Sequence, residues 1–218
     1  MFVFLTRMRD VMYPTAVGMP AEVDEPIDQV LDRLESALAK HAPDTLASLQ
    51  PGVTATQLKE LEGKLGVQLS DDLRSLYMWR NGQVDDFKVD FIPIHHFASL
   101  ERLVEERKEM VRQREEATGL QRVLGEAFIG HRFDWLPIFQ DLAGDGYYYD
   151  PTRSHAEGAV FYNFNETGEF VFFPSLKNLL AGFVECYEMG VYSIDSDGRL
   201  VADYGRSREV WTKYGTPN

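Results

Sequence analysis

The sequence predicts a single-domain α+β fold in which a mostly antiparallel sheet is covered by helices on one face. Apolar residues recur at helical spacing through residues 24–81, whereas residues 135–173 contain short aromatic runs separated by turn residues. One more apolar helix is expected after the last aromatic run. Helices followed by a meander of strands and a closing helix are typical of an α+β layer architecture.

The helical part is expected to follow a loosely attached arm formed by residues 1–23. Pro26, after two acidic residues, suits a helix start, and this helix is expected to end near His41. Its buried stripe is predicted to be Ile27, Val30, Leu31, Leu34 and Leu38. Thr54 and Gln57 have the spacing of a capping box, which predicts a second helix that ends at Gly66. Its buried face is predicted to be Leu58, Leu61 and Leu65.

A third, short helix is expected to begin at Ser70 or Asp71 and to stop at Asn81-Gly82. Its apolar face is predicted to be Leu73, Leu76 and Tyr77. The period then changes, because Phe87–Ile94 alternates apolar and polar residues like a strand, and Pro93 places the end of that strand at a sheet edge. Leu100–Thr118 interleaves Glu and Arg with a few apolar residues, which predicts an amphipathic surface helix with a solvated charged face.

Four aromatic runs are predicted to form the sheet: Trp135–Phe139, Tyr147–Tyr149, Val160–Phe164 and Phe170–Phe173. Pro174-Ser175 then opens the closing helix. Its inward side chains are predicted to be Leu176, Leu179, Leu180 and Phe183. Residues 191–218 are interpreted as a C-terminal extension, in which a hairpin is expected around Asp197-Gly198.

Charge is the most informative property of the composition. The chain has 218 residues and a net charge of −13, and between Asp134 and Asp203 twelve acidic residues face three basic ones, a local net charge of −9. Such a surface repels nucleic acid and anionic membranes and attracts basic proteins, although acidity can also serve solubility alone. A single cysteine and the lack of an apolar run near 18 residues lead us to expect a soluble, cytoplasmic protein.

The sequence contains no motif typical of an enzyme: no G-x-S-x-G, P-loop, G-x-G-x-x-G or H-E-x-x-H. His95 and His96 are adjacent near a predicted strand end, so their side chains should point to opposite faces and not share a metal. Cys186 has no cationic neighbour in its apolar helix and is interpreted as a packed thiol. Asp195-x-Asp197 lacks the further ligands of a calcium loop. We therefore expect no catalysis, no metal and no cofactor.

Three aspartates come closest to a functional site. Asp141, Asp145 and Asp150 lie in the short segment DLAGDGYYYD. Turn structure alone, contact with a partner, and acid–base chemistry or cation binding all remain open for them.

Three segments, taken together, carry a family resemblance. VTATQLKELEGKLGVQLSDDLRSLYMWRNGQ (Val53–Gln83) contains a helix, a G-V-x-L segment, D-L-R-x-L-Y and an Asn-Gly stop. WLPIFQDLAGDGYYYDP (Trp135–Pro151) contains W-L-P-I, a Gly-Asp turn and a strand ending in Asp, and Gly158–Phe183 contains a strand pair and the closing helix. In this order they resemble the Smi/Knr-type cell-wall-assembly-regulator family of the SUKH superfamily over residues 24–190. Ser70 replaces the usual Pro, the helix at 100–118 is longer than usual, and both termini extend beyond the resemblance.

The resemblance implies a binding protein with an α+β fold. Bacterial members act as immunity proteins that neutralise polymorphic or contact-dependent toxins, and fungal relatives act as regulatory scaffolds. The leading hypothesis is a cytoplasmic immunity protein whose partner is a basic toxin domain; the alternative is a scaffold or adaptor without a toxin partner, and an enzyme ranks third. The expected contact residues are Trp79, Asn81, Asp85, Asp86, Asp141, Asp145 and Tyr147, with a core position as the other interpretation of Trp79. If the acidity serves solubility only, the interface is expected on an apolar surface around the Phe87–Phe97 edge.

Overall fold

A computed structural model describes residues 20, 23–84, 88–116, 135–151, 159–164 and 168–215. Its helices are α2 (Ile27–His41), α3 (Pro43–Ser48), α4 (Ala55–Leu65), α5 (Asp71–Trp79), α6 (Leu100–Glu116), α8 (Leu176–Glu188) and α9 (Tyr204–Tyr214). Its strands are β1 (Leu49–Pro51), β2 (Arg80–Gln83), β3 (His96–Phe97), β4 (Leu136–Gln140), β5 (Gly146–Tyr149), β6 (Val160–Phe164), β7 (Gly168–Phe173), β8 (Tyr192–Ile194) and β9 (Leu200–Ala202).

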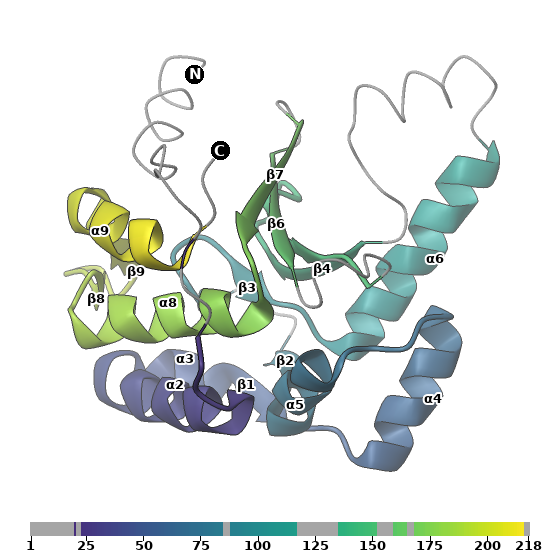
Figure 1. Ribbon diagram of the computed structural model, residues 1–218, viewed down its shortest axis with the longest axis horizontal. Helices are drawn as coiled ribbons and strands as arrows, with labels where there is room; N and C mark the ends of the chain where they lie inside the picture. Colours follow the sequence, from purple (N-terminus) through teal and green to yellow (C-terminus); the bar gives the residue numbers. More distant parts are fainter. Residues whose placement is uncertain are drawn as a thin grey trace.

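The central sheet has five strands in the order β3-β4-β5-β6-β7, and every neighbouring pair is antiparallel. Helix α8 packs on β7 and, on its other side, against α2, so that it lies between the sheet and the N-terminal helices (Figure 1). Rings from both layers meet in the core: Phe139 and Tyr147 of the sheet lie 5.3 and 5.8 Å from Phe183 of α8. The predicted α+β fold is confirmed.

Side chains on the opposite face of the sheet form a smaller cluster. Tyr148 and Phe161 alternate with the core-facing residues of β5 and β6, and the Trp135 ring stacks on Phe161 with centroids 4.5 Å apart. Successive strand residues point to opposite faces, so aromatic strands of this kind supply apolar side chains to both. No helix in the described part of the chain is long and apolar enough to cross a membrane.

The N-terminal helices agree with their sequence signals. Thr54 and Gln57 form the complete capping box of α4, Gly66 adopts φ +70° at its end, and the Ser70 hydroxyl caps α5. The predicted apolar stripes of these helices and of α2 are buried apart from the partly buried Ile27. Helix α5 ends at Trp79, just before the predicted stop at Asn81-Gly82, but these two residues lie in strand β2 and not in a turn.

Strand β2 exists because of tertiary contacts. It pairs with β1, and the Gln50 amide donates to the main-chain oxygens of Asn81 (3.2 Å) and Gln83 (2.9 Å). At Gly82, a Cβ atom would lie 2.5 Å from the backbone nitrogen of Ser99, so a side chain does not fit where the two segments cross. Asn-Gly therefore continues the chain into a strand here, although the same dipeptide commonly marks a turn.

The strand predicted over Phe87–Ile94 is also wrong where the structure describes it; Phe87 itself lies outside the described residues. Residues 88–95 lead into a tight turn with one isolated bridge, Ile92 to His95, and β3 comprises only His96 and Phe97. Pro93 lacks a backbone N–H and has a fixed φ, so it favours a turn position over a continued strand. The adjacent residues Phe91 and Ile92 are both buried and Ile94 is exposed, so the alternation does not correspond to the two faces of a strand.

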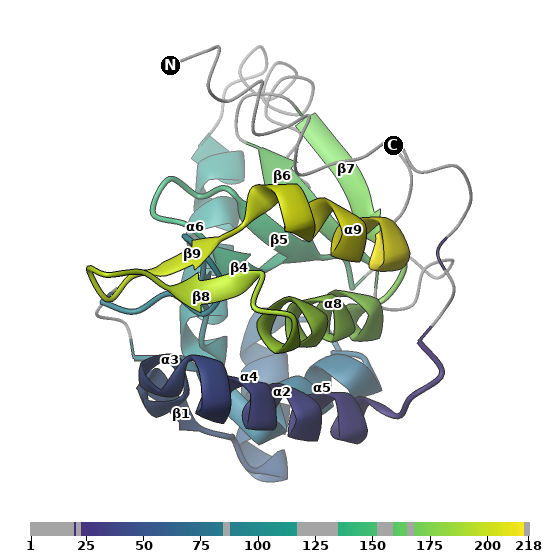
Figure 2. The ribbon, with the colours of Figure 1, turned by 90° about the vertical axis from the view of Figure 1, so that its left-hand side faces the viewer.

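The C-terminal residues pack onto the same core. The expected hairpin is present as β8 and β9, with Asp197-Gly198 in its turn (Figure 2). Helix α9, which the sequence analysis did not predict, begins at the N-cap Asp203, whose carboxylate accepts from Gly205 N and Arg206 N. Its buried residues are Ser207, Val210, Trp211 and Tyr214. Their helical spacing after a capping Asp was a sequence signal that could have predicted this helix.

Candidate functional site

The first two predicted contact residues lie beside α2 and α6. The Trp79 side chain is half-buried; its Nε1 donates to the Glu35 carboxylate at 2.6 Å, and the Arg80 guanidinium lies 5.4 Å from its ring centroid. Asn81 is buried, donating to Glu101 at 2.7 Å and accepting from Leu100 N at 3.0 Å. Asn81 therefore orients the start of α6, and a partner cannot reach its amide in this structure.

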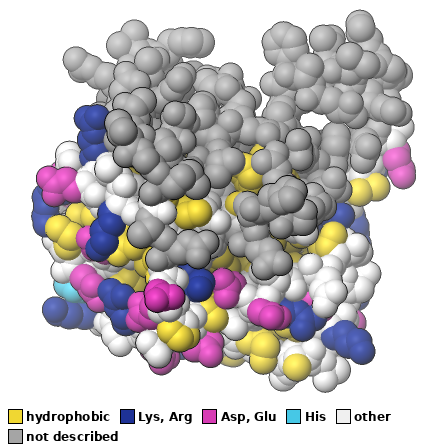
Figure 3. Space-filling view, viewed as in Figure 1, with side chains coloured by type: hydrophobic (Ala, Val, Ile, Leu, Met, Phe, Trp, Pro, Cys, Tyr) yellow, Lys and Arg dark blue, Asp and Glu magenta, His cyan; other side chains and the backbone are white. Residues whose placement is uncertain are grey.

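Both signs of charge are present over the N-terminal helices. Arg33 bonds Glu25 at 3.0 Å and Glu188 at 3.1 Å, and Arg80 bonds Glu35 at 2.9 Å. Figure 3 shows basic and acidic side chains interspersed across the described part of this face. Each of these pairs cancels its own charge locally, although residues 24–84 as a whole contain ten acidic and six basic residues.

The β4–β5 turn holds the next predicted contacts. Asp141 Oδ1 accepts from Ala143 N at 2.8 Å and from Asp145 N at 2.9 Å, and Asp141 N donates to Asp145 O at 2.8 Å. Both carboxylates are half-exposed, and Leu142 between them is 77% exposed. One oxygen of Asp141 builds the turn, so this aspartate has a structural role. The same turn also presents negative charge and the apolar Leu142 side chain to solvent.

The remaining predicted contacts are not at this surface. Tyr147 is 1% exposed and lies among the core rings, so a partner cannot touch it without unfolding the sheet. The Tyr147 ring therefore serves to fill the core and not to contact a partner. Asp150 is also buried. Asp85 and Asp86 lie outside the described residues.

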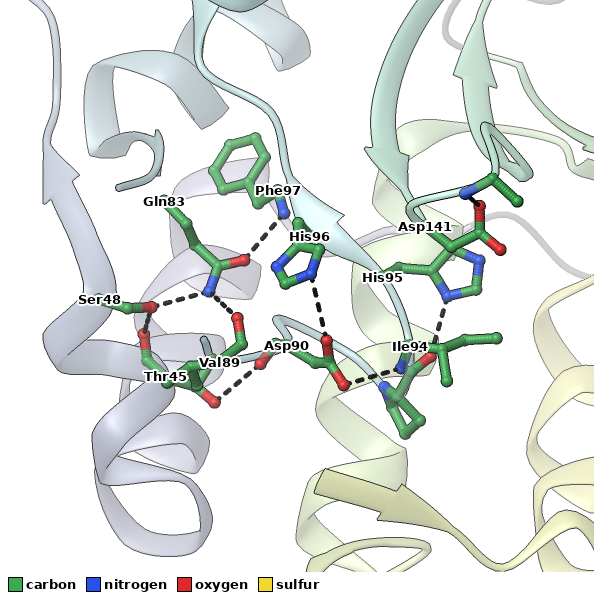
Figure 4. A network of polar contacts seen from close by, with 12 residues as sticks. Thr45, Ser48, Gln83, Val89, Asp90, Ile94, His95, His96, Phe97 and Asp141 are labelled. Carbon is green, nitrogen blue, oxygen red and sulfur yellow. Dashed lines mark hydrogen bonds and ion pairs between the residues drawn. The ribbon is translucent and has the colours of Figure 1, made fainter. Parts of the chain in front are cut away.

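His95 lies opposite this acidic turn. Strand pairing joins His96 to Gln140, which places His95 across from Asp141 (Figure 4). The His95 ring is 1% exposed; its Nδ1 lies 2.9 Å from Pro93 O and its Nε2 lies 3.1 Å from the Tyr162 hydroxyl. In the neutral ring, Nδ1 donates to the carbonyl and Nε2 accepts from the tyrosine. Burial lowers the pKa of His95 to about 4, although the Pro93 carbonyl and the Asp141 charge oppose that shift.

A polar network fixes the turn that contains His95. Gln83 donates to Ser48 Oγ at 2.8 Å and to Val89 O at 2.9 Å, while its side-chain oxygen accepts from Phe97 N at 3.0 Å. Thr45 Oγ1 donates to the Asp90 carbonyl at 3.0 Å (Figure 4). The network thus ties α3, β2 and β3 to the segment that precedes the turn, and it holds both ends of residues 88–97.

Asp90 supports the turn from its outer side. One carboxylate oxygen accepts from Ile94 N at 3.2 Å, and the other lies 3.4 Å from Nε2 of His96. Burial raises the pKa of Asp90, while the His96 ring opposes the rise. The two histidine rings point away from each other (Figure 4). Within the described residues, no three His, Cys, Asp or Glu side chains form a group able to hold a metal ion.

A small cavity lies between the His95 turn and the C-terminal elements. Its volume is about 20 Å³, and its lining includes Pro93, His95, Tyr147, Ala202 and Tyr204. That is room for about one water molecule, far below the roughly 300 Å³ of a typical small-molecule site. Cys186, elsewhere in the core, is buried, and burial raises the pKa of its thiol, which keeps it protonated.

The structure therefore brings the Asp141–Asp145 turn together with the Ile92–His95 turn, which stands where the sequence predicts the end of a strand. Its sequence signal was Ile-Pro-Ile-His, because Pro favours the second position of a four-residue turn. Trp79 lies in the helical part of the fold, at the end of α5.

Comparison with protein families matches residues 52–182 to the SMI1 / KNR4 family (SUKH-1). The match runs from Gly52 into α8 and includes both turns, and it agrees with the resemblance noted in the sequence. A search of curated proteins found no match. Since the matched residues make up more than half of the 218-residue chain, the protein belongs to the SMI1/KNR4 (SUKH-1) family.

Proposed function

We propose that the chain is a cytoplasmic immunity protein that neutralises a co-encoded toxin by direct binding and catalyses no reaction. Membership of the SMI1/KNR4 family carries this proposal, because binding is what the family resemblance implies and toxin neutralisation is the role it implies for bacterial members. The partner we expect is a basic toxin domain; nucleic acid and membranes are not expected partners.

The charge distribution supports a basic partner. The chain carries a net charge of −13, and the Asp141–Asp145 turn, which the Asp141 carboxylate fixes, presents two partly exposed aspartates beside an exposed leucine. A negative field raises the association rate of a cationic partner and adds specificity more than affinity.

The direct test expresses the product of the gene adjacent to the one encoding this chain, with and without the chain, in a bacterial host. We expect the neighbour alone to arrest growth, co-expression to restore it, and calorimetry to detect a complex of the two purified proteins. Absence of a complex would contradict the proposal. A complex with a harmless neighbour would instead favour the regulatory scaffold.

Charge removal tests the electrostatic part. A charge reversal to Lys at position 141 would remove the negative charge and, with it, the two backbone contacts of Asp141. Asp141→Asn and Asp145→Asn remove the charge alone, since Asn retains an accepting oxygen. The double variant should slow association severalfold at 0.01 M salt, where the Debye length is about 30 Å, and much less at 0.1 M, where it is about 10 Å. Glu60→Gln on α4, an exposed residue paired with Lys64, is the matched control and should leave the rate unchanged.

A further inference from the structure

Ile94 occupies a backbone conformation that is unfavourable for a residue with a β-branched side chain. Among the described residues it is the one non-glycine with positive φ, at +64°. The preceding residue is Pro93, and His95 N donates to Ile92 O at 2.9 Å, which is the arrangement of a type II turn with Ile94 in its third position. Gly or Asn normally occupies that position, and a β-branched residue there is a marked outlier.

The strain at Ile94 is not offset by burial of its own side chain. Asp90 accepts from its backbone N–H, and the buried His95 ring anchors the Pro93 carbonyl, so neighbouring residues hold the turn in place. The Ile94 side chain itself remains 47% exposed. An apolar side chain that costs stability and remains in solvent points to a role outside folding.

Two further exposed aliphatic side chains belong to the same end of the molecule. The β3–β4 register places Leu142, which follows Asp141, just beyond the His95 turn. Across the small cavity lie Tyr192 and Ala202 of the β8–β9 hairpin, and Ile194, two residues after Tyr192, is on the same hairpin face. Leu142 is 77% exposed and Ile194 is 45% exposed. Figure 2 shows the hairpin extending from the body of the fold on this side.

Residues 92–95, 141–145 and 194–203 together make up what we call the three-turn surface. These segments contain five aspartates and one arginine, Arg199, which is itself paired with Asp195 and Asp197. An apolar centre inside a charged rim is the usual anatomy of a protein interface. Charge complementarity selects the occupant: a second copy of this chain would bring the same negative rim, whereas a basic protein would bring the opposite sign.

We propose that the three-turn surface is the docking site for a basic protein partner, with Ile94 and Leu142 as its apolar anchors. This inference rests on the proposed function and adds the location of the interface. The strained turn pre-organises Ile94, so the anchor is held in place before the partner arrives, and binding does not have to order it.

The experiment uses the full-length chain, with the purified product of the adjacent gene as probe, and compares three variants. Ile94→Asn should raise the melting temperature by about 2–4 °C, because Asn tolerates positive φ, and should weaken binding at least tenfold. Leu142→Ser should weaken binding severalfold without changing the melting temperature. Met78→Ser, on α5, is the control because Met78 is 49% exposed, a fraction similar to that of Ile94. It should leave binding unchanged.

The outcomes separate this inference from the proposed function. No binding by the wild-type chain would overturn both. Wild-type binding that Ile94→Asn and Leu142→Ser leave intact would overturn the three-turn surface and leave the proposed function standing. A fall in melting temperature for Ile94→Asn would overturn the strain argument. A wild-type dimer in sedimentation that Ile94→Asn dissociates would show a self-interface instead of a basic partner's site.

Discussion

In the helical layer formed by α2, α4 and α5, the residues that carry the local sequence signals occupy positions that suit their chemistry: Thr54 caps a helix, Gly66 takes the left-handed position, and Leu73 is fully buried. The three-turn surface contains the opposite cases. There Ile94 holds a position suited to glycine, a histidine is buried beside a carboxylate turn, and Leu142 is in solvent. Natural proteins depart from local rules mainly at functional sites, so the contrast favours placing function at the turns and stability in the helices.

The largest expected effect tests the stability half of this contrast. Leu73 of α5 is 0% exposed, so Leu73→Ala should reduce the free energy of unfolding by about 2–5 kcal/mol. Leu61→Ala, at a site that is 7% exposed, should fall toward the lower end of the same range. Denaturant melts with Met78→Ser as the exposed control measure this. Losses under about 0.5 kcal/mol would show that the helical layer is not where stability resides.

Acid should destabilise the protein through His95. Its pKa is about 4 in the folded state against the ordinary 6.5, so the unfolded chain takes up a proton that the folded chain refuses. Stability from this group is therefore complete above pH 6.5, decreases as the pH falls, and is lost by pH 4, a change of about 3 kcal/mol.

The matched variant for this prediction is His95→Gln, which cannot titrate. Urea melts from pH 7 to pH 4 should show a smaller decrease in stability for His95→Gln than for the wild-type chain, whatever its stability at pH 7. Parallel pH profiles would mean that His95 is not held neutral by burial. The buried histidine would then no longer distinguish the three-turn surface from the helical layer.

A moderate effect is expected at Asp141, where the structural and charge roles can be separated. Asp141→Ala removes the acceptor of two backbone N–H groups and should cost about 1–2 kcal/mol of stability, whereas Asp141→Asn should cost much less. Thermal melts of both variants decide. Equal losses would show that the charge, and not the turn geometry, stabilises this segment.

The smallest effect is expected at the capping box. Thr54→Ala removes the side-chain oxygen that accepts from Gln57 N and should cost about 1 kcal/mol, while Thr54→Ser should preserve most of the stability. Neither change should alter partner binding, because the helical layer is not part of the proposed interface. Weaker binding by a stably folded Thr54→Ala would break the division between the two regions.

The sequence by itself determined the elements whose signals are local. Capping at Thr54 and Ser70, the left-handed Gly66 and the leucine stripes specify α4 and α5 almost completely, because a helix is stabilised by residues three and four positions apart. The aromatic strands, the closing helix and the family resemblance were readable for the same reason: turn residues and a period of two lie within short windows of sequence.

Only the tertiary structure decided which residues meet. Asn-Gly at 81–82 became a strand because β1 pairs with it, and Tyr147 became a core residue because the Phe183 ring of α8 packs on it. The turn that gives Ile94 its positive φ is held locally by Asp90 and His95, and the His95 ring is in turn held by the Tyr162 hydroxyl of β6. The β1–β2 pairing, the Tyr147–Phe183 contact and the His95–Tyr162 contact join residues tens of positions apart, and no local pattern encodes them. The meeting of Ile94, Leu142 and Ile194 at one end of the fold could therefore not be predicted from the sequence.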